Sequence, residues 1–261
     1  MAEPGRKTLH FVRHGESVAN EAIADALAAA GLSDADDSFK GAARGISYAV
    51  MNDPARFDSD LSTLGIEQAT ALAAAAHRPE GIELLVASSL SRAIHTAALA
   101  FPESQGFPRP ILCLDETREF AGPPTSEKRH RASEMRPHLA AVAGLRAEEL
   151  DISRVPEEDD LWQPREEGGR SAFSRADKAL AFLMARPERV IACIGHTSFM
   201  RRCLLGGRNR SVVVHGTEQE KKALWRAFEN CEVRSVEMWQ ERGQPGKFFL
   251  RPLKQPVAQK L

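Results

Sequence analysis

The chain has 261 residues, of which 43% are hydrophobic and 27% charged, and its net charge is −1. This length suits one large domain, and the balanced charge excludes a general attraction to nucleic acid or to an anionic membrane. No apolar run reaches the roughly 18 residues that a membrane span needs, and we expect no signal peptide before the first apolar segment. Any anion site must therefore be a local cluster of basic side chains.

Short apolar runs alternate with longer helical runs along the chain. In chain order we predict a strand at 9–12, helices at 16–30 and 63–77, a strand at 82–87, a helix at 90–101, a strand at 111–114, a helix at 171–185, a strand at 190–194, a helix at 198–205, a short strand at 211–214, a helix at 218–228 and a strand at 233–239. This alternation predicts an α/β sandwich with a largely parallel sheet.

Two segments lack a regular pattern. Residues 32–60 are polar and rich in Asp, Ser and Gly, whereas residues 117–170 carry five prolines and a run of four acidic residues. A run of this kind is usually solvated surface. We interpret residues 1–261 as one domain with a core at about 8–240, and the two segments as excursions over its active face. We expect the tail from Pro252 to be loose.

The four cysteines lie far apart in the sequence and form no C-x-x-C pair; they are Cys113, Cys193, Cys203 and Cys231. In a chain of this size, this pattern predicts reduced thiols and a cytoplasmic location instead of a disulfide framework.

Two histidines and two arginines stand out by their positions. His14 and His196 each follow a predicted strand, Arg13 adjoins His14, and Arg92 begins a helix just after the strand at 82–87. Ligands of open α/β sheets bind at the carboxyl ends of the strands. We therefore expect these four side chains to converge in one pocket.

A phosphate dianion suits such a cluster. Arginine offers paired donors in a planar fork, and charge-assisted hydrogen bonds to phosphate are strong. Neighbouring cations also lower the pKa of a histidine, and the neutral imidazole keeps the lone pair that a nucleophile needs. We expect Gly15, which has no Cβ, to let the backbone approach the bound group closely.

The sequence RHGESVAN at residues 13–20 resembles the R-H-G-E-x-x-x-N signature of the phosphoglycerate mutase-like histidine phosphatases. Further segments resemble other motifs of that family in the same order, at 60–69, 88–97, 191–201 and 228–232. The resemblance spans roughly residues 8–240. Two positions depart from it, because Thr197 stands where many members have glycine and Ser89 where proline is usual.

The resemblance implies a three-layer sandwich with a largely parallel central sheet and a two-step phosphoryl transfer. His14 would become the phosphohistidine, and no metal or other cofactor is expected. The expected catalytic partner is His196, and the expected phosphate ligands are Arg13, Arg92, Asn20 and Thr197.

The general acid is assigned by context. The family has a glutamate shortly after the third strand in an L-x-E context, which Leu114-Asp115-Glu116 matches. We therefore predict Glu116 as the acid, with Glu119 in reserve and Asp115 as a weaker third candidate.

Other phosphatase chemistries lack their motifs. A cysteine phosphatase needs C-x5-R, but the residues six positions after the four cysteines are Glu119, Phe199, Asn209 and Glu237. No G-x-x-x-x-G-K-[ST] loop and no H-E-x-x-H zinc motif occurs.

The resemblance leaves a phosphatase, a mutase and a non-catalytic phospholigand-binding protein open. The mutases have a short tryptophan-containing stretch that residues 21–59 lack, and Trp162, followed by Glu166, Glu167 and Arg175, resembles the phosphatases. We therefore predict a phosphoric monoester hydrolase of the histidine acid phosphatase type. Its partner would be a small phosphorylated substrate of unknown identity, with no nucleic acid or membrane involved.

Overall fold

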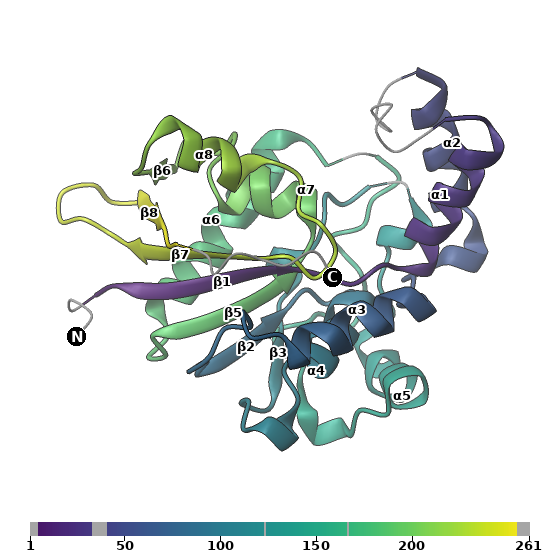
Figure 1. Ribbon diagram of the computed structural model, residues 1–261, viewed down its shortest axis with the longest axis horizontal. Coiled ribbons are helices and arrows are strands. Elements are labelled where there is room, and N and C mark those ends of the chain that lie inside the picture. The colour runs from purple at the N-terminus through teal and green to yellow at the C-terminus, as the bar shows by residue number, and fades with distance from the viewer. Residues whose placement is uncertain (1–4, 33–40, 123, 166, 255–261) are drawn as a thin grey trace.

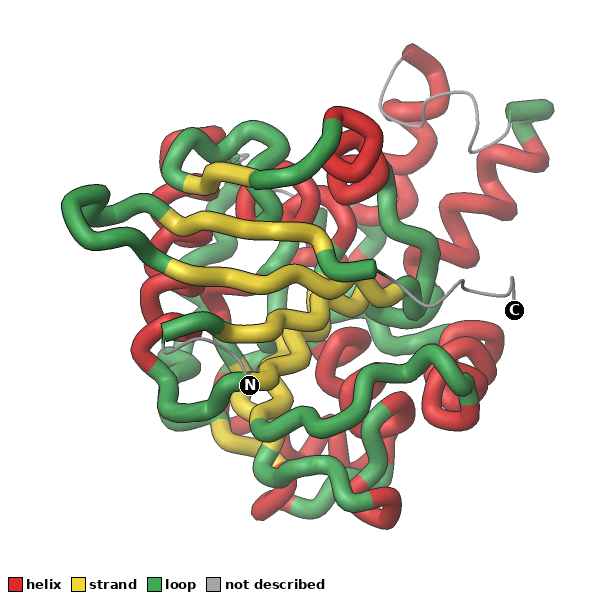
Figure 2. Tube along the Cα trace, turned by 60° about the vertical axis from the view of Figure 1, so that its left-hand side comes forward, coloured by secondary structure: helices red, strands yellow, loops and turns green. Residues whose placement is uncertain are grey.

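In the computed structural model, which describes residues 5–32, 41–122, 124–165 and 167–254, one eight-stranded sheet runs through the molecule (Figures 1 and 2). Its strand order is β4-β3-β2-β5-β1-β7-β8-β6. The strands are β1 (Lys7–Arg13), β2 (Leu84–Ala87), β3 (Ile111–Cys113), β4 (Leu150–Asp151), β5 (Val190–Gly195), β6 (Val212–Val214), β7 (Val233–Trp239) and β8 (Phe248–Pro252). Only β7 pairs antiparallel, with β1 and with β8, among the described strands.

Helices cover both faces of the sheet. The helices are α1 (Val18–Ala29), α2 (Gly41–Met51), α3 (Thr63–Ala74), α4 (Ser91–Ala100), α5 (Ala132–Ala143), α6 (Gly169–Ala185), α7 (Thr197–Phe199), a π-helical turn (Met200–Leu204) and α8 (Glu218–Trp225). Buried residues of α3, α4 and α5 pack on one face, and those of α6, the π-helical turn and α8 pack on the other (Figure 1). The three-layer α/β sandwich with a largely parallel sheet is therefore confirmed.

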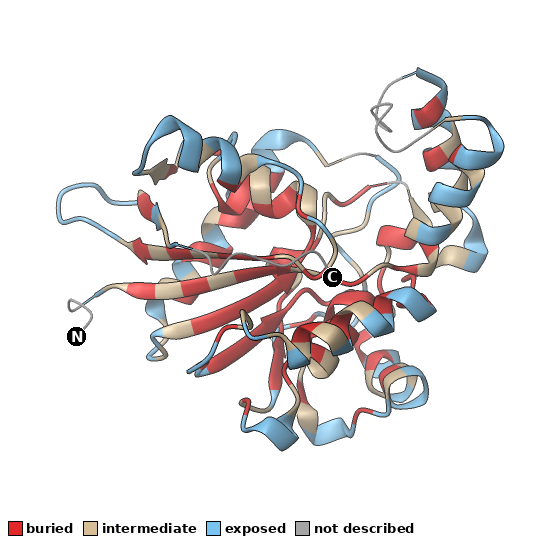
Figure 3. Ribbon diagram, in the orientation of Figure 1, coloured by how far each residue is buried: buried red, intermediate tan, exposed pale blue. Residues whose placement is uncertain are grey.

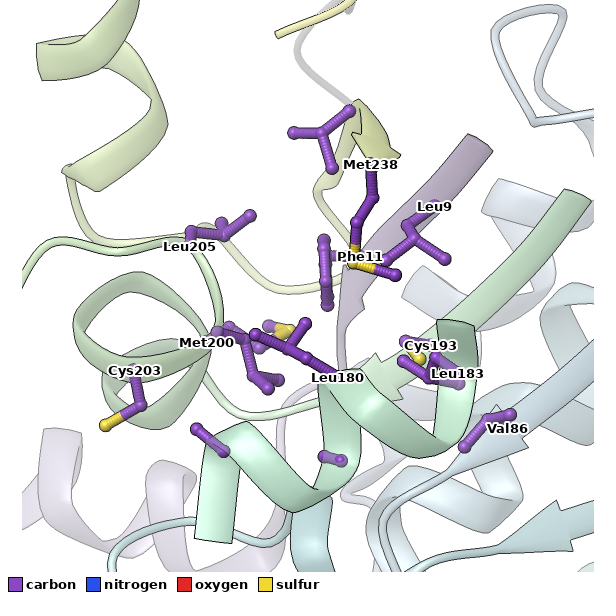
Figure 4. Close-up of a cluster of buried hydrophobic side chains, with 14 of the residues drawn as sticks. Leu9, Phe11, Val86, Leu180, Leu183, Cys193, Met200, Cys203, Leu205 and Met238 are labelled. Atoms are coloured by element: carbon purple, nitrogen blue, oxygen red, sulfur yellow. The ribbon is translucent and has the colours of Figure 1, made fainter. Parts of the chain in front are cut away.

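The alternation of side chains along each strand builds the two cores. In β2, Leu84 and Val86 join the core under α6, while Leu85 and Ala87 join the core under α4. Strand β2 is buried throughout and β5 is buried from Ile191 on, whereas buried and half-buried residues alternate in most of β1 (Figure 3); Figure 4 shows the α6 side of the sheet. A fully buried Val, Leu, Ile, Phe or Met side chain contributes about 1.5–3 kcal/mol. The side chains between the sheet and its two helix layers therefore account for most of the favourable burial.

The prediction of an irregular segment at 32–60 is wrong for its described part. Helix α2 occupies Gly41–Met51 and packs against α1. Ala43 and Ser47 are buried and Ile46 and Val50 are half-buried, so the contact stripe has helical spacing. The residue composition did not indicate a helix here, because two glycines and several polar residues surround the stripe. Residues 33–40 lie outside the described part of the chain.

The prediction of irregular structure across 117–170 also needs correction. Helix α5 runs through Pro137, because Ala132, Met135 and Leu139 insert into the core beside α4. An interior proline costs a helix about 3 kcal/mol, and burial of this apolar stripe offsets that cost. Pro123 lies outside the described residues.

Two further elements differ from prediction. The predicted helix at 198–205 is a three-residue α-turn followed by the π-helical turn. Strand β8, which the sequence did not reveal, ends at Pro252 and so orders part of the tail. Within the described residues no helix combines the length and the apolarity needed to cross a bilayer.

Candidate active site

The register of the central strands brings the predicted side chains to one edge of the sheet. Strand β5 lies between β2 and β1, and Arg13, the last residue of β1, pairs with Gly195, the last residue of β5. The His14 N–H donates to the Gly195 carbonyl at 3.0 Å, and the Ser88 N–H donates to Ile194 at 2.9 Å. The three strands therefore end level, at the carboxyl edge where a ligand is expected.

The two histidines and Arg92 form one buried cluster. The rings of His14 and His196 lie 5.0 Å apart between centroids. Arg92 Nε lies 3.4 Å from His14 Nε2, and Arg92 Nη2 lies 3.4 Å from His196 Nδ1. All three side chains are buried. The structure thus brings together three of the residues that the sequence singled out.

His14 is held as a neutral imidazole. Its Nδ1 lies 2.6 Å from the Gly15 carbonyl, which can only accept, so Nδ1 carries the proton and Nε2 keeps a lone pair. Burial lowers the pKa of His14 well below its usual value, and the charges of Arg92 and Arg13 lower it further. The arginines thus act in the expected direction, although burial is the larger cause.

Arg13 lies close enough to the cluster for its charge to lower the pKa of His14. Its Nη1 donates to the Phe228 carbonyl at 2.7 Å, while its buried Nε has no hydrogen-bond partner among the described residues. Burial lowers the pKa of this guanidinium, and the charge of Glu119 is the largest opposing influence. The late segment holds the loop in place, because Asn230 Nδ2 donates to the His14 carbonyl at 3.0 Å. Arg13 therefore has an N–H available for an anion.

Gly15 approaches α3 closely. A Cβ on Gly15 would lie 2.5 Å from the Gly65 carbonyl oxygen, so this contact requires a residue without a side chain, and an approach of Gly15 to a bound group stays a prediction. Glu16 N donates to Gln68 Oε1 at 2.8 Å, and Ser62 Oγ donates to Glu16 Oε1 at 2.8 Å. The start of α3 therefore supports the loop that carries His14.

Asn20 and Thr197 make structural contacts near the site. The Asn20 side chain accepts from Ser17 N at 3.3 Å in the capping box of α1. Thr197 Oγ1 accepts from Phe228 N at 2.8 Å, which fixes the segment whose carbonyl holds Arg13. A direct contact of either residue with phosphate stays a prediction.

His196 is tied to the end of β2. Its Nε2 lies 2.8 Å from the hydroxyl of Ser88, which is fully buried. Burial and the charge of Arg92 lower the pKa of His196 well below its usual value. Since a hydroxyl can donate or accept, Ser88 can support a proton on either ring nitrogen.

The three acid candidates lie in different surroundings. Glu119 Oε2 accepts from Ser198 N at 3.0 Å, two residues after His196. Glu116 lies 3.9 Å from Arg154 Nη2 and has no hydrogen bond or ion pair with the described histidines or arginines of the cluster. Asp115 is paired with buried Arg129 at 3.1 Å and accepts from the hydroxyl of Ser89. Of the three, Glu119 approaches the cluster.

Glu127 was missed by the sequence analysis. Its two carboxylate oxygens lie 2.9 and 2.8 Å from Arg92 Nη2, and Arg92 Nη1 donates to the Ser126 carbonyl. Burial raises the pKa of Glu127, while Arg92 lowers it. No local pattern marks this residue, which follows the prolines of an apparently irregular segment. Within the described residues, no three His, Cys, Asp or Glu side chains lie close enough together to hold a metal ion.

Solved structures with similar folds cover nearly the whole chain. A putative α-ribazole-5'-P phosphatase from Escherichia coli aligns with a TM-score of 0.53 at 19% identity, covering 98% of both chains. A mycobacterial glucosyl-3-phosphoglycerate phosphatase aligns with a TM-score of 0.51 at 17% identity, covering 97% of this chain and 100% of the other. At these identities the likeness shows the fold.

The family follows from the sequence profile. No curated protein sequence matches the chain. The profile described as histidine phosphatase superfamily (branch 1) matches residues 54–247, which is well over half of the 261 residues and includes Arg92 and His196. The match begins after the segment of Arg13 and His14. It supports phosphoryl transfer of the phosphatase or mutase type, and the chain belongs to branch 1 of the histidine phosphatase superfamily.

Proposed function

We propose that the protein is a phosphatase that hydrolyses a small phosphomonoester through a phosphohistidine on His14. The observation that carries this proposal is the neutral His14, whose Nε2 lone pair lies among two arginines and a second histidine. A nucleophile beside preorganised cations is the arrangement that phosphoryl transfer requires.

In the first step, the substrate phosphate docks against Arg13, Arg92 and His196. His14 Nε2 attacks phosphorus in line with the leaving oxygen, so that an N–P bond forms as the P–O bond breaks. The guanidinium groups stabilise the charge on the equatorial oxygens. His196 Nδ1 accepts from Arg92 Nη2 at 3.4 Å in the free protein, so it donates to a phosphate oxygen only after the phosphate replaces this contact and Ser88 donates to Nε2. Asn20 and Thr197 remain predicted further ligands.

Glu119, the reserve candidate, is the general acid that the geometry favours over Glu116. Its carboxylate borders the site at Ser198 N, and its charge acts on Arg13. Protonated Glu119 donates to the leaving oxygen. The resulting carboxylate then takes a proton from water, which attacks phosphorus, breaks the N–P bond and releases phosphate and neutral His14.

Hydrolysis is favoured over mutase transfer. Two similar folds bear the names of phosphatases that act on phosphate esters of small molecules. Trp162, part of the phosphatase-like sequence pattern, donates from Nε1 to the Pro124 carbonyl at 3.2 Å and so supports the segment that carries Glu127. Glu166 lies outside the described residues. A non-catalytic role is disfavoured because both histidines and both arginines of the predicted site are present, namely His14, His196, Arg13 and Arg92.

Replacement of the nucleophile tests the proposal. We expect His14→Ala to reduce kcat on an aryl phosphate more than a hundredfold, about 2.7 kcal/mol in barrier, because the covalent step is lost. Rapid-quench mass spectrometry should detect phosphoenzyme in the wild type only. His215→Ala, which alters an exposed histidine, should keep both signals. A His14→Ala variant with more than about a hundredth of wild-type kcat would refute the mechanism.

Four finer assignments stay predictions: the single domain over 1–261, the cytoplasmic location, the histidine acid phosphatase type and independence of metals and other cofactors. The four cysteines are free and buried, which is in keeping with the predicted reduced thiols.

A further inference from the structure

A second basic cavity lies along the segment that leaves His196. It has a volume of about 110 Å³ and is lined by Arg201, Arg202, Gly207, Arg208 and Trp225. Two of the arginines belong to the π-helical turn, and the tryptophan ends α8. None of these residues has a part in the proposed phosphoryl transfer.

The three guanidinium groups of this cavity form no ion pair with a described carboxylate. Across the described ranges, no carboxylate lies within 4.0 Å of Arg201, Arg202 or Arg208. Arg201 and Arg202 are half-buried and Arg208 is exposed, whereas fully buried arginines are paired, as Arg92 is with Glu127. Three like charges around one cavity repel each other, and a bound anion would remove that cost.

Arg201 has the clearest unmet hydrogen-bonding capacity. Its Nε is buried without a partner among the described residues, and its Nη1 makes only a 3.5 Å contact with the Trp225 carbonyl. Burial lowers the pKa of this guanidinium and repulsion from Arg202 and Arg208 lowers it further, while the charge of Glu119 raises it. A buried donor without an acceptor destabilises the protein, and an anionic acceptor would offset that cost.

The backbone holds the arginines together. Gly206 has a φ of +77°, and a Cβ on Gly207 would lie 2.4 Å from the Arg201 carbonyl oxygen, so this turn requires both glycines. The Arg208 N–H donates to the Arg202 carbonyl at 2.8 Å, and this hydrogen bond holds Arg208 beside the cavity. Trp225 Nε1 donates to the Leu205 carbonyl at 2.7 Å and fixes the opposite wall.

We propose that this cavity is a second anion-binding site, which takes one phosphate group. Pockets for drug-sized ligands measure about 300–1,000 Å³, so a cavity of about 110 Å³ suits a single compact oxyanion. Guanidinium groups bind phosphate oxygens through charge-assisted, often paired hydrogen bonds. The phosphate group is either free phosphate or the second phosphate of a bisphosphorylated substrate.

Trp225 provides a reporter for binding. Inorganic phosphate is added to the full chain at constant ionic strength, and the Trp225 signal is taken as the emission change of the wild type minus that of Trp225→Phe. We expect a saturable Trp225 signal, which His14→Ala retains. The Kd should rise at least tenfold in Arg202→Gln/Arg208→Gln. The control Arg210→Gln/Arg242→Gln removes two exposed charges outside the cavity and should stay within twofold.

Two results would overturn the anion site. One is the absence of any Trp225-dependent change on adding phosphate. The other is an equal Kd in the two double variants, which would indicate general charge screening. This measurement does not rest on catalysis, so an inactive protein would contradict the proposed phosphatase and leave the cavity proposal standing.

Kinetics then identify the source of the phosphate group, a step that does rest on the proposed phosphatase. The KM values of a sugar monophosphate and the matching bisphosphate are compared between the wild type and Arg202→Gln/Arg208→Gln. If the cavity holds the substrate's second phosphate, KM should rise at least tenfold for the bisphosphate alone. If it holds free phosphate, both KM values should stay within twofold while the Trp225 signal is lost.

Discussion

At the level of single residues, two carboxylates border the proposed phosphate pocket on different sides. Glu119 accepts from backbone N–H groups of Ser198 and Phe120, and its charge acts on Arg13. Glu127 instead places both oxygens against Arg92. Both Glu127 oxygens are thus engaged with Arg92, which Glu127 positions, whereas the Glu119 carboxyl group pairs with no guanidinium among the described residues and is the group that we propose donates to the leaving oxygen.

The dependence of activity on the leaving group distinguishes the general acid from the neighbouring carboxyl groups. An alkoxide must be protonated as it departs, whereas a nitrophenolate leaves unaided. We expect Glu119→Gln to lose about 10²–10⁴-fold in kcat/KM on an alkyl phosphate and far less on an aryl phosphate. Phosphoenzyme should accumulate after a burst, because its hydrolysis lacks the base. Glu116→Gln is the matched control. A leaving-group dependence confined to Glu116→Gln would return the role to the residue first predicted.

Removing the charge of Glu127 should make the stability of the protein depend more strongly on phosphate. Arg92 is buried, and loss of one partner of a buried pair costs about 3–5 kcal/mol. Phosphate can supply the missing anion, so it should raise the Tm of Glu127→Gln more than that of the wild type. Differential scanning calorimetry with and without phosphate measures this.

Glu167→Gln provides the control for that experiment. It breaks the equally buried pair with Arg175, whose atoms lie 2.6 Å apart, away from the two histidines. Its Tm should fall, but phosphate should shift it only as much as it shifts the wild type. Equal phosphate shifts in both variants would show that Glu127 does not compete with phosphate for Arg92.

At the level of elements, the contact between α3 and the loop after β1 governs the position of His14. Gly15 and Gly65 approach each other backbone to backbone, and Glu16 is bound by Ser62 and Gln68. The predicted motif in 60–69 therefore supports the loop that carries His14. This explains why residues so far from His14 in sequence belong to the same pattern.

A single methyl group at this contact should displace the loop. A Cβ on Gly65 would lie 1.9 Å from the Glu16 carbonyl oxygen, so Gly65→Ala must move backbone. We expect a loss of about 1–3 kcal/mol in stability and at least a tenfold loss in kcat/KM. In Gly45→Ala, on α2, the added Cβ meets open space. That variant should keep its activity and gain about 0.5–1 kcal/mol. Wild-type activity in a folded Gly65→Ala would argue against this support role.

At the level of the whole molecule, buried neutral histidines make stability depend on pH. Burial lowers the pKa of His10 to about 4, and His14 and His196 are lowered well below their usual values. Below pH 6.5 the unfolded chain binds protons that the folded chain does not, so stability falls as pH falls. Each histidine contributes about 1.4 kcal/mol per pH unit until its folded pKa is reached. His138 acts in the opposite direction, because Asp60 raises its pKa.

Urea unfolding between pH 7 and pH 5 measures this linkage. The free energy of unfolding should decrease with falling pH, and His10→Asn should lower the slope by up to about 1.4 kcal/mol per unit, because one of the differential protons is removed. His10 is bonded to Ser235 at 2.7 Å, away from the catalytic cluster, so the variant should keep activity. An unchanged slope would contradict burial as the cause.

Local patterns in the sequence were enough to predict the features that depend on neighbouring residues. Alternating apolar runs predicted the strands and most of the helices, and therefore the layered fold, because side-chain periodicity reports burial directly. The residues at strand ends predicted the cluster of His14, Arg92 and His196, because the ends of neighbouring parallel strands share one edge.

Tertiary structure alone decided the features that depend on partners distant in sequence. Helix α5 forms through Pro137 because its apolar stripe reaches the core, a contact that outweighs local propensity. Glu127 meets Arg92 across a turn with no recognisable motif, and the neighbour of Gly15 is Gly65, fifty residues away. Glu119 approaches the site while Glu116 faces Arg154, although three positions separate them, because the chain turns between them. The direction of a side chain in such a turn is set by the packing around it, which no local pattern records.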